Sequence, residues 1–243
     1  MKILFIRHGD PDYERDSLTE KGWREAEYLA ERLSKLDIAA FYTSPLGRAR
    51  DTAAPILARM GREAQTLDWL REFHAPILRP DTGGKRNVPW DWLPQDWTVV
   101  EDFYHPDRWC LPEMMQEGGV KEEYDRVTAG LDSLLASHGY VREGRFYRAE
   151  RPNSDTVALF CHFGVGGVLL SHLLSVSPLP LLQGLCAAPS SVTTAVTEER
   201  RQGIASFRVS AYGDISHLYA HGEPPSPSAR FCECFDNADQ RHD

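Results

Sequence analysis

The sequence predicts an α/β fold, a three-layer α/β/α sandwich around a mostly parallel central sheet. Short apolar runs alternate along the chain with stretches of helical period, an alternation that gives parallel strands joined by right-handed crossovers. Hydrophobic residues make up 42% of the 243 residues and charged residues 26%, a balance typical of globular proteins with an ample core. A chain of this length approaches the upper size for one core, so we expect a single domain over residues 1–221.

The N-terminal elements are the clearest. The apolar run Lys2–Ile6 predicts a buried strand. Ser17–Leu36 changes to a helical period and predicts an amphipathic helix, capped by Thr19 or by Ser17 together with Glu20. The apolar face of this helix comprises Trp23, Ala26, Leu29, Leu33 and Leu36.

A second strand and helix follow at once. Ile38–Tyr42 predicts a strand, and Pro45–Met60 predicts a helix that ends before Gly61. Gln65–Leu70 is a weak third strand. Phe73–Gly119 is rich in Pro and Gly and holds four of the six tryptophans, so we expect an insertion at about 73–119 made of short helices folded over the sheet.

The second half returns to regular elements. Val120–His138 predicts a helix, and Tyr140–Arg148 predicts a small excursion or a hairpin. Thr156–Cys161 is a buried strand by its apolar run, and Gly164–Leu174 follows as a helix. The closing strands are predicted over Val192–Thr197 and Ile204–Ser210, and residues 222–243, rich in Pro and Ser, predict a flexible tail.

Charge and cysteine content exclude several classes of protein. A formal net charge of −9 argues against a broad nucleic-acid surface, although a small basic pocket for one phosphate needs only a few arginines. Five cysteines at irregular spacing suit free thiols in a reducing compartment, and Cys232 with Cys234 lacks the second pair of a metal site. The N-terminal apolar run is too short for a signal peptide, and Phe163–Leu174 is too short for a membrane span. We expect a cytoplasmic protein with no membrane partner, no metal and no cofactor.

The first group of candidate site residues is Arg7-His8-Gly9, where the first strand ends. Ligands of open parallel sheets bind at the carboxyl ends of the strands. A neutral imidazole there is a nucleophile, an arginine neutralises phosphate oxygens, and a glycine allows close backbone approach to a ligand. The alternative is a surface histidine beside an exposed arginine.

The second group is the run Thr43–Ala53, between the second strand and the second helix. Ser44 is expected to cap the helix and Pro45 to occupy its first position. Arg48 then lies on the first turn, where the helix N-terminus already favours anions. We take Arg48 as the ligand and Arg50 as part of the solvated helix face.

Two more residues complete the set. His162 follows the predicted strand Thr156–Cys161, so a second imidazole is placed at the same sheet edge to donate to a phosphate. Glu72 follows the weak third strand, and phosphoryl transfer needs a proton donor for the leaving oxygen. The alternatives are a strand-end histidine that caps a carbonyl and an exposed glutamate paired with Arg71.

Taken together, Arg7-His8-Gly9, the run with Arg48, the Leu-x-Glu at Glu72 and His162 after a strand resemble the histidine phosphatase superfamily. That group includes phosphoglycerate mutases and broad-specificity phosphatases. The resemblance implies a phosphoglycerate mutase-like fold and no metal. It also implies that His8 becomes phosphohistidine, that the phosphate pocket is formed by Arg7, Arg48 and His162, and that Glu72 is the proton donor.

The chain departs from the mutase pattern at three places. Asp10–Glu14 stands where the mutases have Thr or Ser and then Asn, and Phe73–Pro76 replaces a Gly and Trp-Glu-Gly pattern. Phe163 replaces the Gly that usually follows the second histidine. These changes leave the pocket in place and favour a phosphatase over a mutase.

The sequence therefore predicts a phosphatase that hydrolyses a small phosphomonoester through a phosphohistidine on His8. The alternatives are phosphoglycerate mutase-type transfer and a non-catalytic module that binds phosphorylated ligands. The insertion is expected to lie over the pocket and select the substrate through the cations Arg79, Lys85, Arg86 and Arg108. Self-association into a homo-oligomer is left open.

Overall fold

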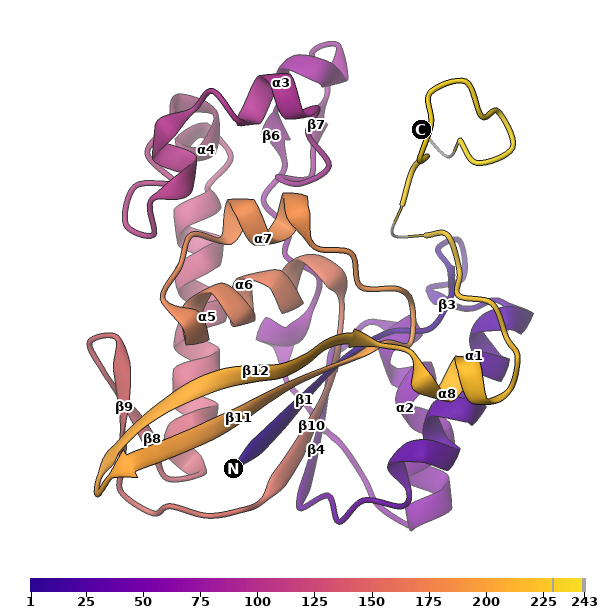
Figure 1. The fold of residues 1–243 in the computed structure, drawn as a ribbon, viewed down its shortest axis with the longest axis vertical. Coiled ribbons are helices and arrows are strands. Elements are labelled where there is room, and N and C mark those ends of the chain that lie inside the picture. Colours follow the sequence, from indigo (N-terminus) through magenta and orange to yellow (C-terminus); the bar gives the residue numbers. More distant parts are fainter. Residues whose placement is uncertain (229, 242–243) are drawn as a thin grey trace.

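The computed structural model describes residues 1–228 and 230–241. Within these residues the main sheet has eight strands in the order β5-β4-β10-β1-β11-β12-β9-β8 (Figure 1). The parallel strands are β1 (Lys2–Arg7), β4 (Ala40–Thr43), β5 (Gln65–Thr66) and β10 (Thr156–Cys161). The strands that pair antiparallel are β8 (Tyr140–Glu143), β9 (Phe146–Ala149), β11 (Val192–Arg201) and β12 (Ile204–Asp214).

The α/β fold class is confirmed, but the sheet is mixed rather than mostly parallel. Tight turns at Gly144 (φ 60°) and Gly203 (φ 78°) join β8 to β9 and β11 to β12. Strands joined by such a turn pair antiparallel, because a parallel pair needs a long crossover. Tyr140–Arg148 is therefore the hairpin alternative of the prediction, and it extends the sheet edge.

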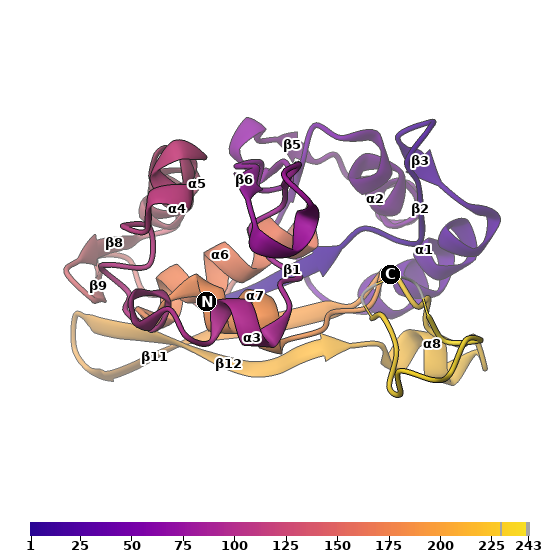
Figure 2. The same cartoon turned by 90° about the horizontal axis from the view of Figure 1, so that it is seen from above.

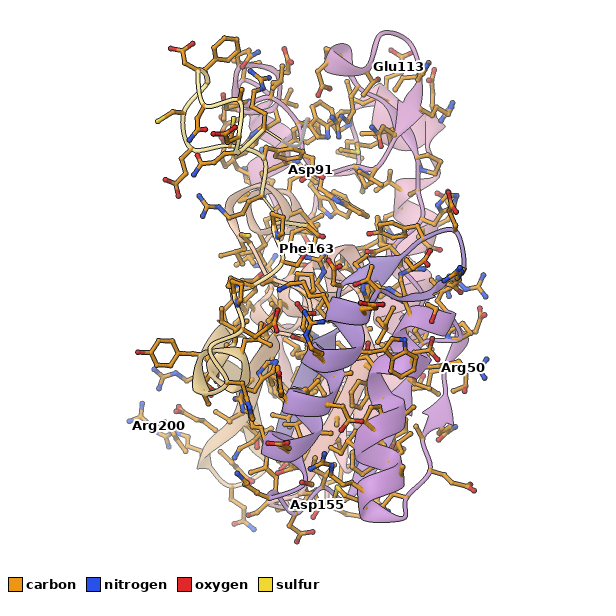
Figure 3. The ribbon with its side chains drawn as sticks, turned by 90° about the vertical axis from the view of Figure 1, so that its right-hand side faces the viewer. Arg50, Asp91, Glu113, Asp155, Phe163 and Arg200 are labelled. Carbon is orange, nitrogen blue, oxygen red and sulfur yellow. The ribbon has the colours of Figure 1, made fainter. Side chains whose placement is uncertain are left out.

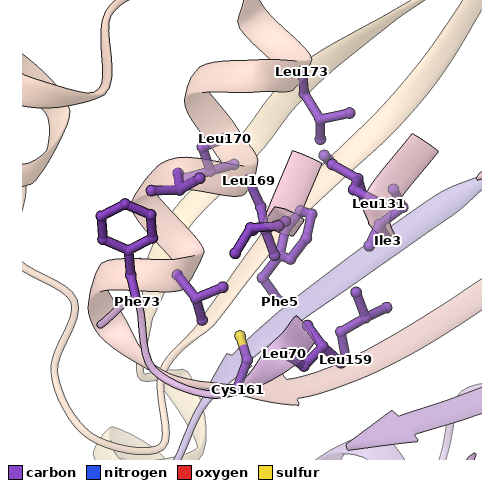
Figure 4. Packing of buried hydrophobic residues seen from close by; sticks show 14 of the residues in the cluster. Ile3, Phe5, Leu70, Phe73, Leu131, Leu159, Cys161, Leu169, Leu170 and Leu173 are labelled. Atoms are coloured by element: carbon purple, nitrogen blue, oxygen red, sulfur yellow. The ribbon is translucent and has the colours of Figure 1, made fainter. Parts of the chain in front are cut away.

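Helices cover both faces of the sheet. One face packs against α1 (Glu20–Leu33) and α2 (Gly47–Met60), and the other against α5 (Val120–Ser137), α6 (Phe163–Leu174) and α7 (Pro178–Gly184) (Figures 1 and 2). Successive side chains of β1 point to opposite faces of the sheet, as the two-residue period of a strand requires. Leu4 and Ile6 pack with α1 and α2, whereas Ile3 and Phe5 pack on the α6 side (Figure 4).

The first helix begins as predicted and ends early. Thr19 is its N-cap, and the Oγ1 of Thr19 accepts a hydrogen bond from the Gly22 N–H at 3.1 Å. The helix stops at Leu33, and Leu36, which lies beyond it, is 39% exposed. Trp23 lies within the helix but is 40% exposed, so it is not part of the buried face.

The second helix begins two residues later than predicted. Its N-cap is Leu46, which makes no side-chain cap, and the helix starts at Gly47, so neither the Ser44 cap nor the first-position Pro45 is correct. The reason is that Ser44 Oγ bonds instead to the imidazole of His162 and to the Leu46 N–H. The predicted end is confirmed, because Gly61 adopts the left-handed backbone (φ 60°) after Met60.

The insertion contains the predicted short helices and also a two-stranded sheet that was not predicted. The third strand shrinks to β5, and Asp68–Leu70 forms a 3₁₀ turn. Residues 73–119 then form β6 (Ile77–Leu78), β7 (Arg86–Asn87), α3 (Pro94–Trp97), α4 (Glu113–Glu117) and the 3₁₀ turns Pro80–Thr82 and Glu101–Tyr104. Trp90, Trp92 and Trp109 are buried in the same apolar cluster as α5 and α6, which fixes the insertion to the sheet layer beneath it.

The remaining elements lie in the loop that follows β1 and near the C-terminus. Pro11–Asp12 (β2) pairs with Ser17–Leu18 (β3), and α8 (Ser216–Ala220) packs beside α1. Part of the segment predicted as a flexible tail makes contacts: Glu223 lies 2.8 Å from Lys21 and 3.2 Å from Arg24. Across residues 1–228 and 230–241, none of the helices has the length and apolarity that crossing a membrane requires.

The cap of α1 generates a stability prediction. Thr19→Ala removes the acceptor for the Gly22 N–H and the 2.7 Å hydrogen bond from Thr19 to Asp10, so the free energy of unfolding in urea should fall by about 1 kcal/mol. The control is Ser133→Ala on the exposed face of α5, which should cause no loss because alanine has the higher helix propensity. Equal losses in the two variants would show that the cap contributes nothing.

Candidate active site

Three parallel strands end at one edge of the sheet and bring the predicted residues together. His8, Ser44 and His162 directly follow β1, β4 and β10. The rings of His8 and His162 lie 5.2 Å apart between centroids, and Ser44 Oγ is 2.8 Å from His162 Nε2. A cleft of about 670 Å³ opens here, and its wall includes Arg7, His8, Arg48 and Glu72. The sheet edge that the sequence predicted as the site therefore holds these side chains together.

The His8 imidazole is held in one tautomer. Its Nδ1 lies 2.8 Å from the carbonyl oxygen of Gly9, which can only accept, so Nδ1 carries the proton. In the neutral ring Nε2 then holds a lone pair. Burial, and after it the positive charge of Arg7, lowers the pKa of His8 to about 3. The imidazole is therefore neutral and nucleophilic across the physiological pH range.

His162 lies beside His8 and is 1% exposed. Burial is the largest cause that holds its pKa well below the usual value, followed by the neighbouring His8, Arg48 and Arg7. Its Nε2 bonds to Ser44, whereas its buried Nδ1 has no hydrogen-bond partner within residues 1–228 and 230–241. An orphaned polar atom next to the nucleophile is unusual in a native core, because such atoms are normally paired.

Arg7 is 8% exposed and has its guanidinium at the cleft wall. One terminal nitrogen donates to the carbonyl of Ala187 at 2.5 Å and the other to the carbonyl of Ser228 at 3.3 Å. Burial lowers the pKa of Arg7, and the guanidinium carbon lies 5.7 Å from the centre of the Phe163 ring. The guanidinium is thus fixed in position by neutral carbonyls.

Arg48 lies on the first turn of α2, as predicted, but it already has a carboxylate partner. Its Nη1 is 2.6 Å from Asp16 Oδ1, and the other oxygen of Asp16 accepts from the Gly47 N–H at 2.7 Å. Arg48 and the Gly47 N–H together lower the pKa of Asp16 against the opposing effect of burial. The predicted contrast with Arg50 is consistent with the structure, since Arg50 is exposed and lies apart from Phe163 in Figure 3.

Glu72 joins the strand edge to the start of α6. Its Oε1 accepts from the backbone N–H groups of Phe73 at 2.8 Å and Val165 at 2.9 Å. Burial raises the pKa of Glu72, although these backbone donors and Arg7 favour its charged form. The alternative pairing with Arg71 is wrong, because Arg71 bonds to Asp68 at 2.5 Å instead.

Comparison with known proteins agrees with this geometry. The sequence model of the histidine phosphatase superfamily, branch 1, matches residues 3–209. This chain belongs to the histidine phosphatase superfamily. A probable phosphatase of Schizosaccharomyces pombe is 38% identical over 233 residues, which cover 90% of this chain and 95% of that protein.

Relatives that carry a mutase name align either over a shorter stretch or at lower identity than this probable phosphatase. A 2,3-bisphosphoglycerate-dependent phosphoglycerate mutase of Thermoplasma acidophilum is 40% identical over 84 residues, or 30% of this chain. The chain spans 42% of the length of that mutase and 40% of a probable phosphoglycerate mutase of Serratia proteamaculans. The family thus contains named phosphatases and named mutases that resemble this chain.

Solved structures show the same fold. A mutant phosphoserine phosphatase of Entamoeba histolytica in complex with phosphoserine superposes with a TM-score of 0.59 at 17% identity and covers 89% of this chain and 98% of its own. A mycobacterial glucosyl-3-phosphoglycerate phosphatase in complex with VO3 gives a TM-score of 0.54 at 20% identity and covers 87% and 98%. At these identities the likeness concerns the fold.

Two predictions for the site residues need correction. A side chain on Gly9 would meet the Gly22 carbonyl oxygen of α1 at 2.9 Å, and the Gly9 N–H donates to Thr52 Oγ1 at 2.9 Å. Close packing on α1, rather than approach to a ligand, therefore explains the glycine. The second correction concerns the cations of the insertion.

Arg79, Lys85, Arg86 and Arg108 do not line the cleft. Arg79 is buried and holds the insertion together: it pairs with Asp81 at 2.6 Å and donates to the Trp90 carbonyl. Arg86 donates to the Pro76 carbonyl, Arg108 pairs with Asp102, and Lys85 is exposed. The insertion does reach the cleft, but through Val88, Trp90 and Asp91.

The C-terminal segment is a second cleft wall that the sequence did not indicate. Pro227, Ser228, Arg230 and Phe231 line the cleft. Ser226 Oγ donates to Asp10 Oδ1 at 2.5 Å, and Ser228 Oγ to the same oxygen at 3.1 Å. Figure 1 shows this yellow segment running from α8 past β3. Only the unusual Asp10 after Gly9 was a signal in the sequence, and its partners lie more than 200 positions away.

The sequence also did not indicate the contact between Ser190 and the backbone of His8. Ser190 is a non-glycine residue in the left-handed region (φ 61°), and its N–H donates to the His8 carbonyl at 2.9 Å. Its Oγ lies 3.0 Å from Nε2 of the buried His217 on α8. Burial, and after it Arg32, lowers the pKa of His217 to about 4, so this partner is neutral.

The donor atoms of the cleft do not form a metal cluster. Within residues 1–228 and 230–241, no group of three or more His, Cys, Asp or Glu side chains is arranged to hold a metal ion. The absence of a metal from the reaction remains a prediction.

Two variants test the strained residue beneath His8. Ser190→Ala and Ser190→Gly both remove the bond to His217, but only glycine adopts a φ of 61° without strain. Both variants should be less stable than the wild type, and the free energy of unfolding should be about 1 kcal/mol higher for Ser190→Gly than for Ser190→Ala. Equal stabilities in urea denaturation would show that the backbone here stores no strain.

Proposed function

We propose that this histidine phosphatase superfamily member is a phosphomonoesterase that works through a phosphohistidine on His8. The observation that carries the proposal is the hydrogen bond from His8 Nδ1 to the Gly9 carbonyl, which directs the unprotonated Nε2 to act as nucleophile. The buried arginine, the second imidazole and the carboxyl group around it are the groups that phosphoryl transfer requires.

In the first half of the reaction, the Nε2 lone pair of His8 attacks phosphorus and the bond to the leaving oxygen breaks. Glu72 gives its proton to that oxygen, so the product leaves as an alcohol. The raised pKa of Glu72 supports this role, because a carboxyl group that keeps its proton can act as an acid. Arg7 and Arg48 neutralise the phosphate oxygens, and His162, whose Nδ1 has no hydrogen-bond partner among the described residues, lies with its ring centre 5.2 Å from that of His8.

In the second half, water attacks the phosphorus of phosphohistidine and the P–N bond breaks. The Glu72 carboxylate takes the proton of the water, which restores the acid for the next cycle. Phosphate then leaves, and the His8 lone pair is free again. Each residue returns to its starting state, so the residues named here complete one catalytic cycle.

A phosphoglycerate mutase is the second candidate, because several relatives carry that name. Hydrolysis is favoured by the 38% identical probable phosphatase, whose alignment covers 95% of its length. The segments that replace the mutase pattern here also have other functions: Asp10 binds the C-terminal segment, and Phe73 is buried in the core. A small phosphorylated substrate, a cytoplasmic location and a single domain over residues 1–221 remain part of the proposal.

The first prediction from the proposed mechanism concerns the nucleophile. His8→Ala should lower the turnover of p-nitrophenyl phosphate by at least about 10³-fold, because the imidazole supplies the nitrogen that attacks phosphorus. A phosphoenzyme that is acid-labile and base-stable should be trapped on the wild type and not on this variant. His105→Ala, an exposed histidine of the insertion, is the control and should keep full activity. Phosphate trapped on a carboxylate or a serine would exclude the mechanism, and conversion of 3-phosphoglycerate without phosphate release would favour the mutase.

The second prediction concerns the acid. Glu72→Gln should slow hydrolysis of alkyl phosphates by about 10²-fold or more, and that of p-nitrophenyl phosphate much less, because a good leaving group needs little protonation. The measurement is kcat/KM across a leaving-group series. Glu63→Gln on the exposed surface is the matched control. Equal slowing across the series would give Glu72 a positioning role only.

A further inference from the structure

We propose that Asp91 determines substrate specificity by accepting a hydrogen bond from a hydroxyl or ammonium group on the leaving-group part of the phosphomonoester. This inference rests on the proposed phosphatase function and names the class of ester. The preferred substrates carry a hydrogen-bond donor away from phosphorus, whereas esters with a carboxylate at that place are disfavoured.

The position of Asp91 is the first argument. It lines the same cleft as Arg7, His8 and Phe163, and Figure 3 shows Asp91 beyond Phe163 in the direction of the insertion. Its carboxylate has no hydrogen bond or ion pair to any residue in 1–228 or 230–241, unlike Asp10, Asp16 and Glu72 around the same cleft. A carboxylate that lines a cleft without a partner is available to a ligand.

The backbone is the second argument. Asp91 adopts a left-handed conformation (φ 61°), which costs free energy in a residue other than glycine and is found most often at functional sites. Both neighbours are fixed: the Trp90 carbonyl accepts from Arg79, and the Trp92 N–H donates to Gln183 Oε1 at 3.1 Å. Trp90 is 7% and Trp92 5% exposed. The core therefore holds Asp91 rigidly in place, which is what a specificity residue requires.

Electrostatics gives the third argument. The cleft must bind a phosphate dianion, and a further carboxylate beside Arg7 opposes that binding through like-charge repulsion. Asp91 is exposed at the cleft wall, yet partial desolvation by its surroundings raises its pKa, and Arg79 and then Arg7 oppose this shift. A substrate hydroxyl or ammonium group offsets the repulsion, because a donor to a carboxylate forms a charge-assisted hydrogen bond. A substrate carboxylate adds to the repulsion.

Arg230 is the cation on the opposite wall that could instead attract a carboxylate. It lies in the C-terminal segment, its side chain is 61% exposed, and it pairs with Glu233 at 2.7 Å. Its charge is therefore largely compensated within the same segment, whereas Asp91 forms no ion pair with a residue in 1–228 or 230–241. The apolar surfaces of Trp90, Phe163 and Phe231 complete the wall and suit the carbon skeleton of a small ester.

The test compares four esters: glycerol phosphate (hydroxyl), O-phosphoethanolamine (ammonium), phosphoglycolate (carboxylate) and p-nitrophenyl phosphate (none of these). Asp91→Asn removes the charge and Asp91→Gly removes the side chain, and both residues accept a positive φ, so the loop keeps its shape. Asp96→Asn in the same insertion, outside the cleft wall, is the control.

We expect Asp91→Gly to lower kcat/KM for the hydroxyl or the ammonium ester about 10-fold or more relative to p-nitrophenyl phosphate, and Asp91→Asn to act in the same direction. The wild type should prefer one of these two esters to phosphoglycolate, and which one it prefers distinguishes a hydroxyl from an ammonium substrate. If both Asp91 variants keep every ratio while hydrolysing p-nitrophenyl phosphate normally, the Asp91 proposal is overturned and the phosphatase function stands. A preference for phosphoglycolate that disappears in Arg230→Gln would also overturn it.

If the wild type hydrolyses none of the four esters, the phosphatase function fails. The Asp91 proposal is then decided by calorimetric binding of the same esters to the wild type and Asp91→Gly. Binding of the hydroxyl or ammonium ester that weakens about 10-fold in the variant supports the proposal, and unchanged affinity overturns it.

Discussion

The parallel register between β1 and β10 is the constraint on which the rest of the site depends. Arg7 lies opposite Cys161, so His8 and His162 leave the sheet side by side, and the His8 N–H donates to the Cys161 carbonyl at 3.0 Å. Both faces of β1 are buried, by Ile3 and Phe5 on one side and by Leu4 and Ile6 on the other. A slip by one residue would turn every side chain of the strand to the wrong layer. Core packing thereby fixes the relative position of the two imidazoles.

Several residues around these two imidazoles have a strained backbone with a positive φ. Within residues 1–228 and 230–241, four residues other than glycine have a positive φ, and three of them either line the cleft or contact a residue that does. Asp16 holds Arg48, Ser190 holds the His8 carbonyl, and Asp91 lines the wall. Such conformations persist only where the surrounding structure enforces them. The protein thus concentrates its local strain where side-chain and backbone groups must be held at fixed positions.

Burial also explains how an acidic protein presents a site suited to anions. The net charge is −9, yet the cleft wall contains Arg7, Arg48 and Arg230. The imidazoles of His8 and His162 stay neutral because burial disfavours their charged forms, so the positive charges of the cleft wall are those of the guanidinium groups. The other walls of the cleft come from three distant parts of the chain: Val88, Trp90 and Asp91 of the insertion, residues 182–186, and the C-terminal residues Pro227, Ser228, Arg230 and Phe231.

The sequence alone predicts the alternation of strands and helices, because that alternation depends on local periodicity. It also predicts that His8, Arg48, Glu72 and His162 meet, because each follows a predicted strand and the carboxyl ends of parallel strands lie at one edge of the sheet. The structure decided what depends on distant contacts. Ser44 does not cap α2, since His162, 118 positions away, takes its hydroxyl. Arg79 stabilises the insertion by donating to the Trp90 carbonyl and does not line the cleft, and Gly9 packs on Gly22. The C-terminal segment has the composition of a tail, yet Asp10 holds it at the cleft, and no periodicity in a sequence encodes a contact between a loop and a segment more than 200 residues apart.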